Sequence, residues 1–195
     1  MIHHKVEQNT DEWQALRCGK FTASSFKDLF MAKSTKGYQS AIHKVVFERL
    51  TGEQPENFQN DYMKRGHELE PLAIEEYEKQ AFNEVLDPGF FELNEWIGAS
   101  PDGLIGTDGI LEIKSPAYNT MINYLLSSKL PSIYKWQVHG QLYVTGRKWC
   151  EFMSFHPKLK PLIIRIERDE AMINELETKL NESIEEVKTI INKIK

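Results

Sequence analysis

The sequence has few cysteines and no long apolar run. Cys18 and Cys150 stand alone without Cys-x-x-Cys spacing, which argues against a disulfide framework and against a zinc or iron–sulfur site. No apolar stretch approaches the roughly 20 residues of a membrane helix, and the start, Met-Ile-His-His-Lys-Val, lacks the apolar core of a signal peptide. We therefore expect a cytoplasmic protein with reduced thiols and no membrane contact.

The composition is ordinary for a globular protein. The 195 residues are 41% hydrophobic and 27% charged, so we expect one domain over residues 1–195 with a sizeable core. The net charge is −5, but residues 1–50 carry eight Lys/Arg against five Asp/Glu, whereas residues 68–112 carry twelve acids against Lys79 alone. A basic arm beside an acidic block suggests a phosphate-binding surface next to a metal-binding one, and charge alone leaves a merely uneven surface equally open.

A β-hairpin is predicted around Ser100-Pro101-Asp102-Gly103 and Leu111-Glu112-Ile113-Lys114. The segment between them, Gly106-Thr107-Asp108-Gly109, is a strong turn signal. A four-residue turn there pairs position 105 with 110 and position 103 with 112, which brings Asp102 and Glu112 side by side. Strand periodicity then puts Glu112 and Lys114 on one face and the apolar residues 111 and 113 on the other.

Two carboxylates and an ammonium at a strand edge have a chemical use. Mg²⁺ takes hard oxygen ligands, often one or two carboxylates, and keeps several waters. A nearby lysine can orient the attacking water and offset phosphate charge, so Asp102, Glu112 and Lys114 indicate a metal-assisted phosphodiesterase. The alternative is a polar hairpin with a surface Lys–Glu pair.

An anion site is predicted near the N-terminus. Residues 9–17 begin with capping and acidic residues and continue with helix formers, Gly19 ends this helix, and the residues Thr22 to Ser25 cap a second one. The hydroxyls and free backbone N–H groups at the start of the second helix could hold a DNA phosphate, and Arg17 lies just upstream to assist them. An ordinary cap beside a surface arginine is the alternative.

A third carboxylate, Glu70, lies in a predicted helix from about residue 61 to 82. It shares a face with Ile74 and Tyr77, and Pro71 biases it away from regular helical geometry. A buried acid at such a position needs a partner, and a metal would serve. Capping of the turn that Pro71 starts is equally open.

The remaining pattern predicts an α/β domain with a mixed central sheet flanked by helices. In the helix predicted over 131–145, Gln137 and Gln141 are one turn apart, as are His139 and Tyr143. Residues 168–195 form a long amphipathic helix that we expect to pack on its own domain. The other predicted elements are helices at 38–51 and 117–127 and strands at 90–93, 96–99, 148–156 and 161–166.

Two motifs carry a family resemblance. Ser-Pro-Asp-Gly-Leu followed by Leu-Glu-Ile-Lys-Ser-Pro resembles the core of the PD-(D/E)XK nucleases, most of all the lambda exonuclease or YqaJ-type phage recombinase branch. That family also carries Trp-x-x-x-Arg-x-Gly-x-x-Thr-Ala-Ser, which Trp13, Arg17, Gly19, Thr22, Ala23 and Ser24 match in type and spacing. The resemblance spans residues 8 to about 167 and implies a restriction-endonuclease-like fold.

The resemblance also implies roles for individual residues. Gly66-His67-Glu68-Leu69-Glu70 matches the helix glutamate that faces the hairpin carboxylates, so Glu70, Asp102, Glu112 and the Ile113 carbonyl would hold Mg²⁺, with Mn²⁺ as a substitute. Lys114 would position the attacking water. Arg17 and Ser24 would hold the 5′-terminal phosphate, with Thr22, Gln137 and Gln141 as further phosphate contacts. The family glutamine of this last helix falls at His139, which makes His139 a candidate catalytic residue.

The function implied is Mg²⁺-dependent 5′-to-3′ digestion of one strand of linear duplex DNA, leaving 3′ overhangs for recombination by strand annealing. The resemblance further implies a homotrimer encircling DNA, a single-strand annealing partner, and a phage or prophage gene expressed in a bacterial cytoplasm. A metal-dependent endonuclease with the same residues is one alternative. A non-catalytic DNA-binding protein is another, but such a protein is expected to have lost an acid or the lysine, and this sequence keeps all four.

Overall fold

The computed structural model describes residues 1–55 and 61–195, and for residues 61–63 the backbone alone. The helices are α1 (Asp11–Arg17), the 3₁₀ turn η1 (Ala23–Ser25), α2 (Phe26–Leu29), α3 (Lys36–Thr51), α4 (Asp61–Ala81), α5 (Tyr118–Ser127), η2 (Ser132–Tyr134), α6 (Lys135–Thr145) and α7 (Glu170–Ile194). The strands are β1 (Ile2–His4), β2 (Phe21–Thr22), β3 (Val85–Leu86), β4 (Phe90–Asn94), β5 (Ile97–Ala99), β6 (Gly103–Ile105), β7 (Gly109–Lys114), β8 (Trp149–Ser154) and β9 (Leu162–Glu167).

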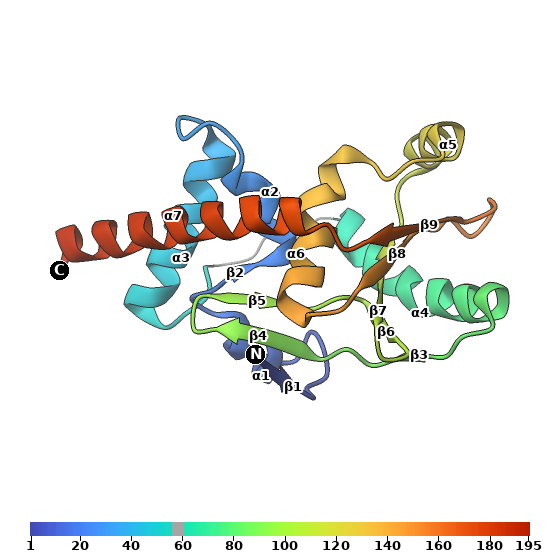
Figure 1. Ribbon diagram of the computed structural model, residues 1–195, viewed down its shortest axis with the longest axis horizontal. Helices are drawn as coiled ribbons and strands as arrows, with labels where there is room; N and C mark the ends of the chain where they lie inside the picture. The colour runs from blue at the N-terminus through green and yellow to red at the C-terminus, as the bar shows by residue number, and fades with distance from the viewer. Residues whose placement is uncertain (56–60) are drawn as a thin grey trace.

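The strands form two mixed sheets (Figure 1). One has the order β3-β6-β7-β8-β9, and all neighbours in it are antiparallel except β7 and β8. The other has the order β1-β4-β5-β2, with β2 parallel to β5. A parallel pair needs a long crossover connection, and the chain between β7 and β8 supplies it as α5, η2 and α6. This crossover carries α6 back across the strand that holds Glu112.

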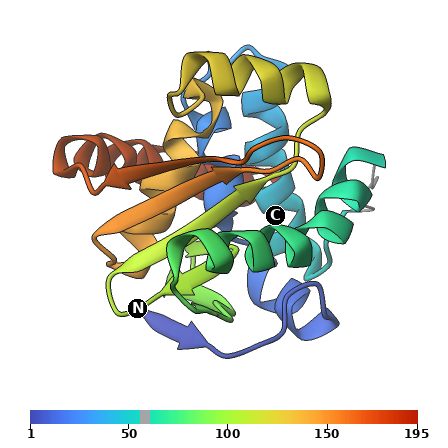
Figure 2. The same ribbon diagram turned by 90° about the vertical axis from the view of Figure 1, so that its right-hand side faces the viewer.

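Helices cover both faces of the larger sheet (Figure 2). Leu111 and Ile113 of β7 point to α4, where they pack with Ala73 and Tyr77. Ile110 points to the opposite side, into the main core with residues of α2, α3, α6 and α7. Strand alternation therefore sends Glu112 to the α6 side and its apolar neighbours to the α4 side, as the sequence predicts.

The C-terminal helix is long and lies against the body of the molecule (Figure 1). The side chain of Asp169 caps it by accepting hydrogen bonds from the N–H groups of Ala171 and Met172 at 2.9 and 3.2 Å. Its apolar stripe is buried in the main core through Leu176, Leu180 and Val187, among others. Within the described part of the chain, no helix is long and apolar enough to cross a membrane.

The helices, and the strands between residues 90 and 167, lie within a few residues of where the sequence predicts them. The short strands β1, β2 and β3 were not predicted, and a single central sheet was expected where two sheets occur. The helix α4 runs through Pro71 without ending, so the expected irregularity at Glu70 does not break it.

The predicted hairpin register is wrong by one residue. Ile105 pairs with Gly109 and Gly103 with Leu111, so the turn is shorter than expected. Gly106 adopts a left-handed φ of 50°, which glycine tolerates and which allows a three-residue connection. The Arg147 guanidinium braces this turn by donating to the carbonyls of Gly106 and Gly109 at 2.9 and 2.7 Å. Carried one residue further, the observed register places Asp102 directly opposite Glu112.

Candidate active site

Glu112 is the centre of the site and is completely buried. Its Oε1 accepts a hydrogen bond from Gln137 Nε2 at 2.6 Å, its Oε2 accepts one from Gln141 Nε2 at 2.5 Å, and the Lys114 ammonium forms an ion pair with it. Gln137 and Gln141 meet the same carboxylate because residues four apart lie on one helix face. Glu112 is thereby held in one orientation by charge-assisted bonds, which are stronger than neutral ones.

Asp102 lies beside Glu112 at the end of β6. Its Oδ2 accepts a hydrogen bond from the Ile113 N–H at 2.6 Å, and its own N–H donates to the Leu111 carbonyl at 3.0 Å. Burial, and then the neighbouring charge of Glu112, raise the pKa of Asp102 well above its usual range. Two carboxylates forced together in this way are poised to gain from a cation.

Lys114 supplies one such cation. Burial by itself lowers the pKa of Lys114, but the charges of Glu112 and Asp102 outweigh it, so the pKa lies above its usual range. The ammonium also lies 5.5 Å from the ring centroid of Tyr134, within the distance of a cation–π contact. Lys114 is therefore firmly protonated and held between a carboxylate and an aromatic ring.

Glu70 approaches the same site from α4 and is half-buried. Burial is the main cause that raises the pKa of Glu70, and the charge of Glu112 adds to it. His67, one turn earlier, has its Nδ1 4.0 Å from Glu70 Oε2. The carboxylate thus lies close enough to the hairpin pair to feel its charge, on the opposite side of β7 from Gln137.

Glu70, Asp102 and Lys114 line one cleft of about 720 Å³, and the buried Glu112 reaches it only through its contacts with Lys114 and Gln137. Its lining includes residues of the hairpin, of α4, of α6 and of the segment that leads into α2. The predicted site residues among them are Ser24, Glu70, Asp102, Ile113, Lys114 and Gln137, joined by His67, Lys27 and Tyr134. The structure thus brings the carboxylates, the lysine and the serine together.

The donor set suits a hard cation such as Mg²⁺, because it consists of carboxylates and a backbone carbonyl whose mutual repulsion a cation relieves. Within the described side chains, no three His, Cys, Asp or Glu groups lie close enough together to hold a metal ion by themselves. Glu112 has its oxygens engaged by Gln137, Gln141 and Lys114. A metal here would therefore take few protein ligands, as Mg²⁺ does when it keeps several of its waters.

The N-terminal segment is fastened to the hairpin through Trp13. The indole Nε1 of Trp13 donates to Ser100 Oγ at 2.8 Å, two residues before Asp102, and the Arg17 guanidinium stacks 4.0 Å from the indole ring. Burial is the main cause that lowers the pKa of Arg17 to about 10, while Glu48 opposes it. Arg17 does not line the cleft, and in the described chain no hydrogen bond joins it to Thr22 or Ser24. Thr22 Oγ1 and Ser24 Oγ lie 3.4 Å apart.

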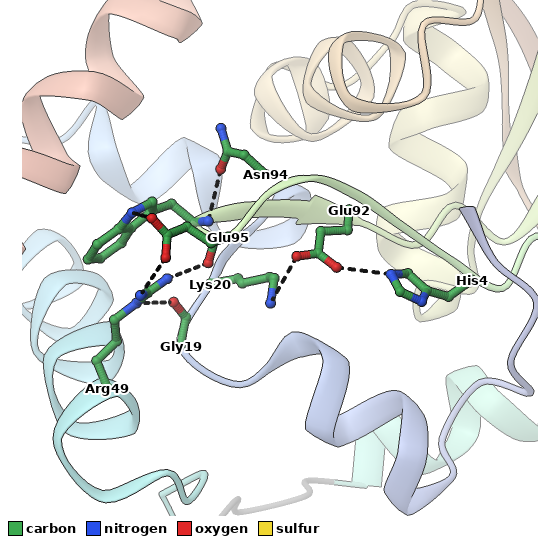
Figure 3. A network of polar contacts seen from close by, with 8 residues as sticks. His4, Gly19, Lys20, Arg49, Glu92, Asn94 and Glu95 are labelled. Carbon is green, nitrogen blue, oxygen red and sulfur yellow. Dashed lines mark hydrogen bonds and ion pairs between the residues drawn. The ribbon is translucent and has the colours of Figure 1, made fainter. Parts of the chain in front are cut away.

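The segment after Arg17 is pinned by α3 (Figure 3). Arg49 Nε donates to the Gly19 carbonyl at 2.9 Å, and Gly19 N–H donates to Glu48 Oε2 at 2.8 Å. Gly19 has a left-handed φ of 74°, and a Cβ there would lie 3.2 Å from Arg49 Cγ, so glycine suits this turn. Beside it, Glu92 of β4 accepts from His4 at 2.9 Å and pairs with Lys20 at 3.7 Å (Figure 3).

The expected placement of His139 in the site is wrong. His139 is buried on the far side of α6, where its charged neighbours are Asp169, Lys135 and Arg168, and burial lowers its pKa. Its Nδ1 finds no hydrogen-bond partner in the described structure. The reason is helical geometry, because a residue two positions after Gln137 points to the opposite side. Gln137 and Gln141 were expected to contact a DNA phosphate, and in the structure their side chains donate hydrogen bonds to Glu112.

Sequence reasoning missed three participants. Lys27 and Tyr134 line the cleft, and Arg65 of α4 donates to the carbonyls of Ser115 and Pro116 at 3.2 and 3.1 Å, just after Lys114. For Lys27 a signal existed, because it lies three residues after Ser24 on a predicted helix. The contacts of Tyr134 and Arg65 are long-range and left no trace in local sequence.

A family match decides what kind of protein carries this site. The family model described as the YqaJ-like viral recombinase domain matches residues 12–148, more than half of the chain. The chain belongs to the YqaJ-like viral recombinase family. Among curated proteins, no significant match is found.

Solved structures agree with membership of the YqaJ-like family. An alkaline exonuclease (LHK-Exo) from Laribacter hongkongensis is 36% identical and superposes with a TM-score of 0.88 over 95% of this chain and 96% of that one. The complex of LHK-Exo with dAMP gives a TM-score of 0.89 at the same identity and coverage. A phage related exonuclease from Haemophilus somnus 129PT, 17% identical with a TM-score of 0.68 over 90% of this chain and 96% of that one, shares the fold. The predicted family and the restriction-endonuclease-like α/β fold are confirmed.

Proposed function

We propose that this YqaJ-like protein is a Mg²⁺-dependent DNA exonuclease that digests one strand of linear duplex from its 5′ end. The observation that carries the proposal is that Glu70, Asp102 and Lys114 line one open cleft, where Lys114 is paired with the buried carboxylate of Glu112. The similarity to LHK-Exo, an alkaline exonuclease that also accommodates dAMP in a crystal structure, supports DNA exonuclease activity.

Magnesium would be held by the carboxylates of Glu70, Asp102 and Glu112 and by the Ile113 carbonyl. When bound there, Mg²⁺ supplies Lewis-acid polarisation of the scissile phosphate and neutralises charge on it. Mn²⁺, which accepts the same oxygen donors, would substitute. Burial, together with the charge of Glu112, raises the pKa of Asp102 and of Glu70, and a cation bound here would favour their charged forms.

The protein's own groups supply positioning. Lys114, protonated and held by Glu112 and Tyr134, donates hydrogen bonds that orient the attacking water in line with the leaving 3′ oxygen. Gln137 and Gln141 keep the Glu112 carboxylate from rotating. Most of the rate gain would come from such fixed charges and from orientation, since little covalent work falls to the protein in phosphodiester hydrolysis.

The strand end would be held by the N-terminal segment. Ser24 lines the cleft and Thr22 lies next to it, so both hydroxyls can donate to a 5′-terminal phosphate. Arg17 would swing from its stack on Trp13 to join them. Recognition of a 5′ phosphate gives 5′-to-3′ polarity, 3′ overhangs, and a place in recombination by strand annealing. A homotrimer around the duplex, a single-strand annealing partner and a phage or prophage gene in a bacterial cytoplasm belong to the same proposal.

The test is digestion of linear duplex DNA and of a closed circle, each with Mg²⁺ or EDTA, by wild type and by Glu112→Gln. The proposal predicts metal-dependent loss of the linear DNA by wild type alone, with the circle intact. A nicked or linearised circle would make the protein an endonuclease that uses the same residues. No cleavage of either DNA would leave a non-catalytic DNA-binding protein.

A further inference from the structure

The cleft is lined by two lysines that differ in their surroundings. Lys114 forms an ion pair with the buried Glu112. Lys27, on α2, lines the same cleft, and among the described residues it has neither a salt bridge nor a side-chain hydrogen bond. A cation without a partner, in a cleft also lined by the carboxylates of Glu70 and Asp102, is available for an anion that enters from outside.

The position of Lys27 is fixed by packing. Its neighbours in α2, Phe26 and Leu29, are buried in the main core. The ring of Phe26 fits against Gly140 of α6, where a Cβ would lie 2.3 Å from the ring. Since α6 also carries Gln137 and Gln141, the backbone of Lys27 is held at a constant place relative to Glu112, while its side chain stays free to move.

Ser24 and Lys27 share one wall of the cleft. They are three residues apart on successive turns of η1 and α2, so their side chains are neighbours on one face. The carboxylates of Glu70, from α4, and Asp102, at the start of the hairpin, line another part of the cleft. A DNA strand between the two walls would have Mg²⁺ on one side and Ser24 with Lys27 on the other.

We propose that Lys27 binds a phosphodiester oxygen of the strand being cleaved, next to the phosphate held by Ser24. This inference rests on the proposed function, since it needs DNA in the cleft. A flexible lysine suits a backbone phosphate because it acts as a point charge and reads no sequence. Lys27 thus positions the strand through a phosphate oxygen, whereas Lys114 orients the attacking water.

Binding measured against salt tests this assignment. Kd for a short 5′-phosphorylated duplex is measured in EDTA between about 50 and 200 mM KCl for wild type, Lys27→Met, Lys27→Arg and the control Lys158→Met, an exposed lysine away from the cleft. We expect Lys27→Met to weaken binding about tenfold at low salt and to reduce the slope of log K against log[salt] by about 0.7–0.9, the value for one phosphate contact. Lys27→Arg should keep the wild-type slope, and Lys158→Met should match wild type.

Other outcomes would overturn it. An unchanged slope for Lys27→Met, with melting temperature preserved, would show that Lys27 does not contact phosphate. A change confined to the Mg²⁺ concentration needed for cleavage would show that Lys27 merely balances the carboxylates. Parallel cleavage assays separate this from the proposed function, because a wild-type protein that binds DNA with the predicted slope but never cleaves refutes the exonuclease and leaves the Lys27 contact standing.

Discussion

Replacing Asp102 with asparagine is expected to stabilise the metal-free protein while abolishing cleavage. Asp102 lies opposite Glu112, and at about 5 Å, the spacing of paired strand residues, two carboxylates repel by about 3 kcal/mol in an effective dielectric of about 20. Lys114 and the hydrogen bond from Ile113 N–H, 2.6 Å long, offset most of this penalty. Asparagine keeps an acceptor for that N–H and removes the charge.

The expected gain in the free energy of unfolding in EDTA is about 1 kcal/mol, or roughly 2–4 °C in Tm. Magnesium should reverse the order. At a hundred times its Kd, a bound ion stabilises wild type by about 2.7 kcal/mol, and Asp102→Asn should lose most of that response. Thermal and urea unfolding in EDTA and in Mg²⁺ measure both effects.

Asp108→Asn is the matched control for Asp102→Asn. Asp108 lies in the same hairpin but at its turn, where it pairs with Lys148 at 2.9 Å on the surface. Because exposed ion pairs contribute little, this variant should keep wild-type stability, Mg²⁺ response and cleavage. Easier unfolding of Asp102→Asn than of wild type in EDTA, or equal stabilisation of both by Mg²⁺, would refute repulsion between Asp102 and Glu112.

Four further variants test individual contacts. Lys114→Met should abolish cleavage while DNA binding persists, and measurable turnover would contradict its role. Arg17→Ala should slow digestion of 5′-phosphorylated ends and spare 5′-hydroxyl ends; equal slowing on both would refute a phosphate contact. Gln141→Leu should cost about 1–3 kcal/mol of stability, because a buried carboxylate loses a donor, and should lower kcat; an unchanged urea midpoint would oppose this. His139→Gln should keep the wild-type cleavage rate, since His139 lies away from the cleft, and a large loss of kcat would return it to the site.

The hairpin shows how far the sequence could predict the site. Strand alternation alone predicted that Glu112 points to one face of β7 and that Leu111 and Ile113 point to the other. The apolar cluster that these two residues form with α4 confirms this. The register was missed because turn length depends on the backbone angle of Gly106, 50° in φ, which the residue type permits but does not dictate.

The helix α6 shows a different limit. A family pattern put His139 at the site, although helical periodicity already placed Gln137 and Gln141 on one face. The local physics was the better guide there. Contacts such as Trp13 Nε1 to Ser100 Oγ, 2.8 Å long across 87 positions of sequence, depend on tertiary packing and leave no local signal. The strands β1 to β3, two or three residues long, could not be predicted for the same reason, because they are defined by pairing with partners distant in sequence.

The most direct test of 5′-to-3′ digestion is the fate of a label at the 5′-phosphorylated end of one strand of a linear duplex, followed in Mg²⁺ over short times. We expect the label to leave first, as a mononucleotide, while the complementary strand stays full length and becomes single-stranded. Release of the label last, or within longer fragments from internal cuts, would contradict 5′-to-3′ digestion.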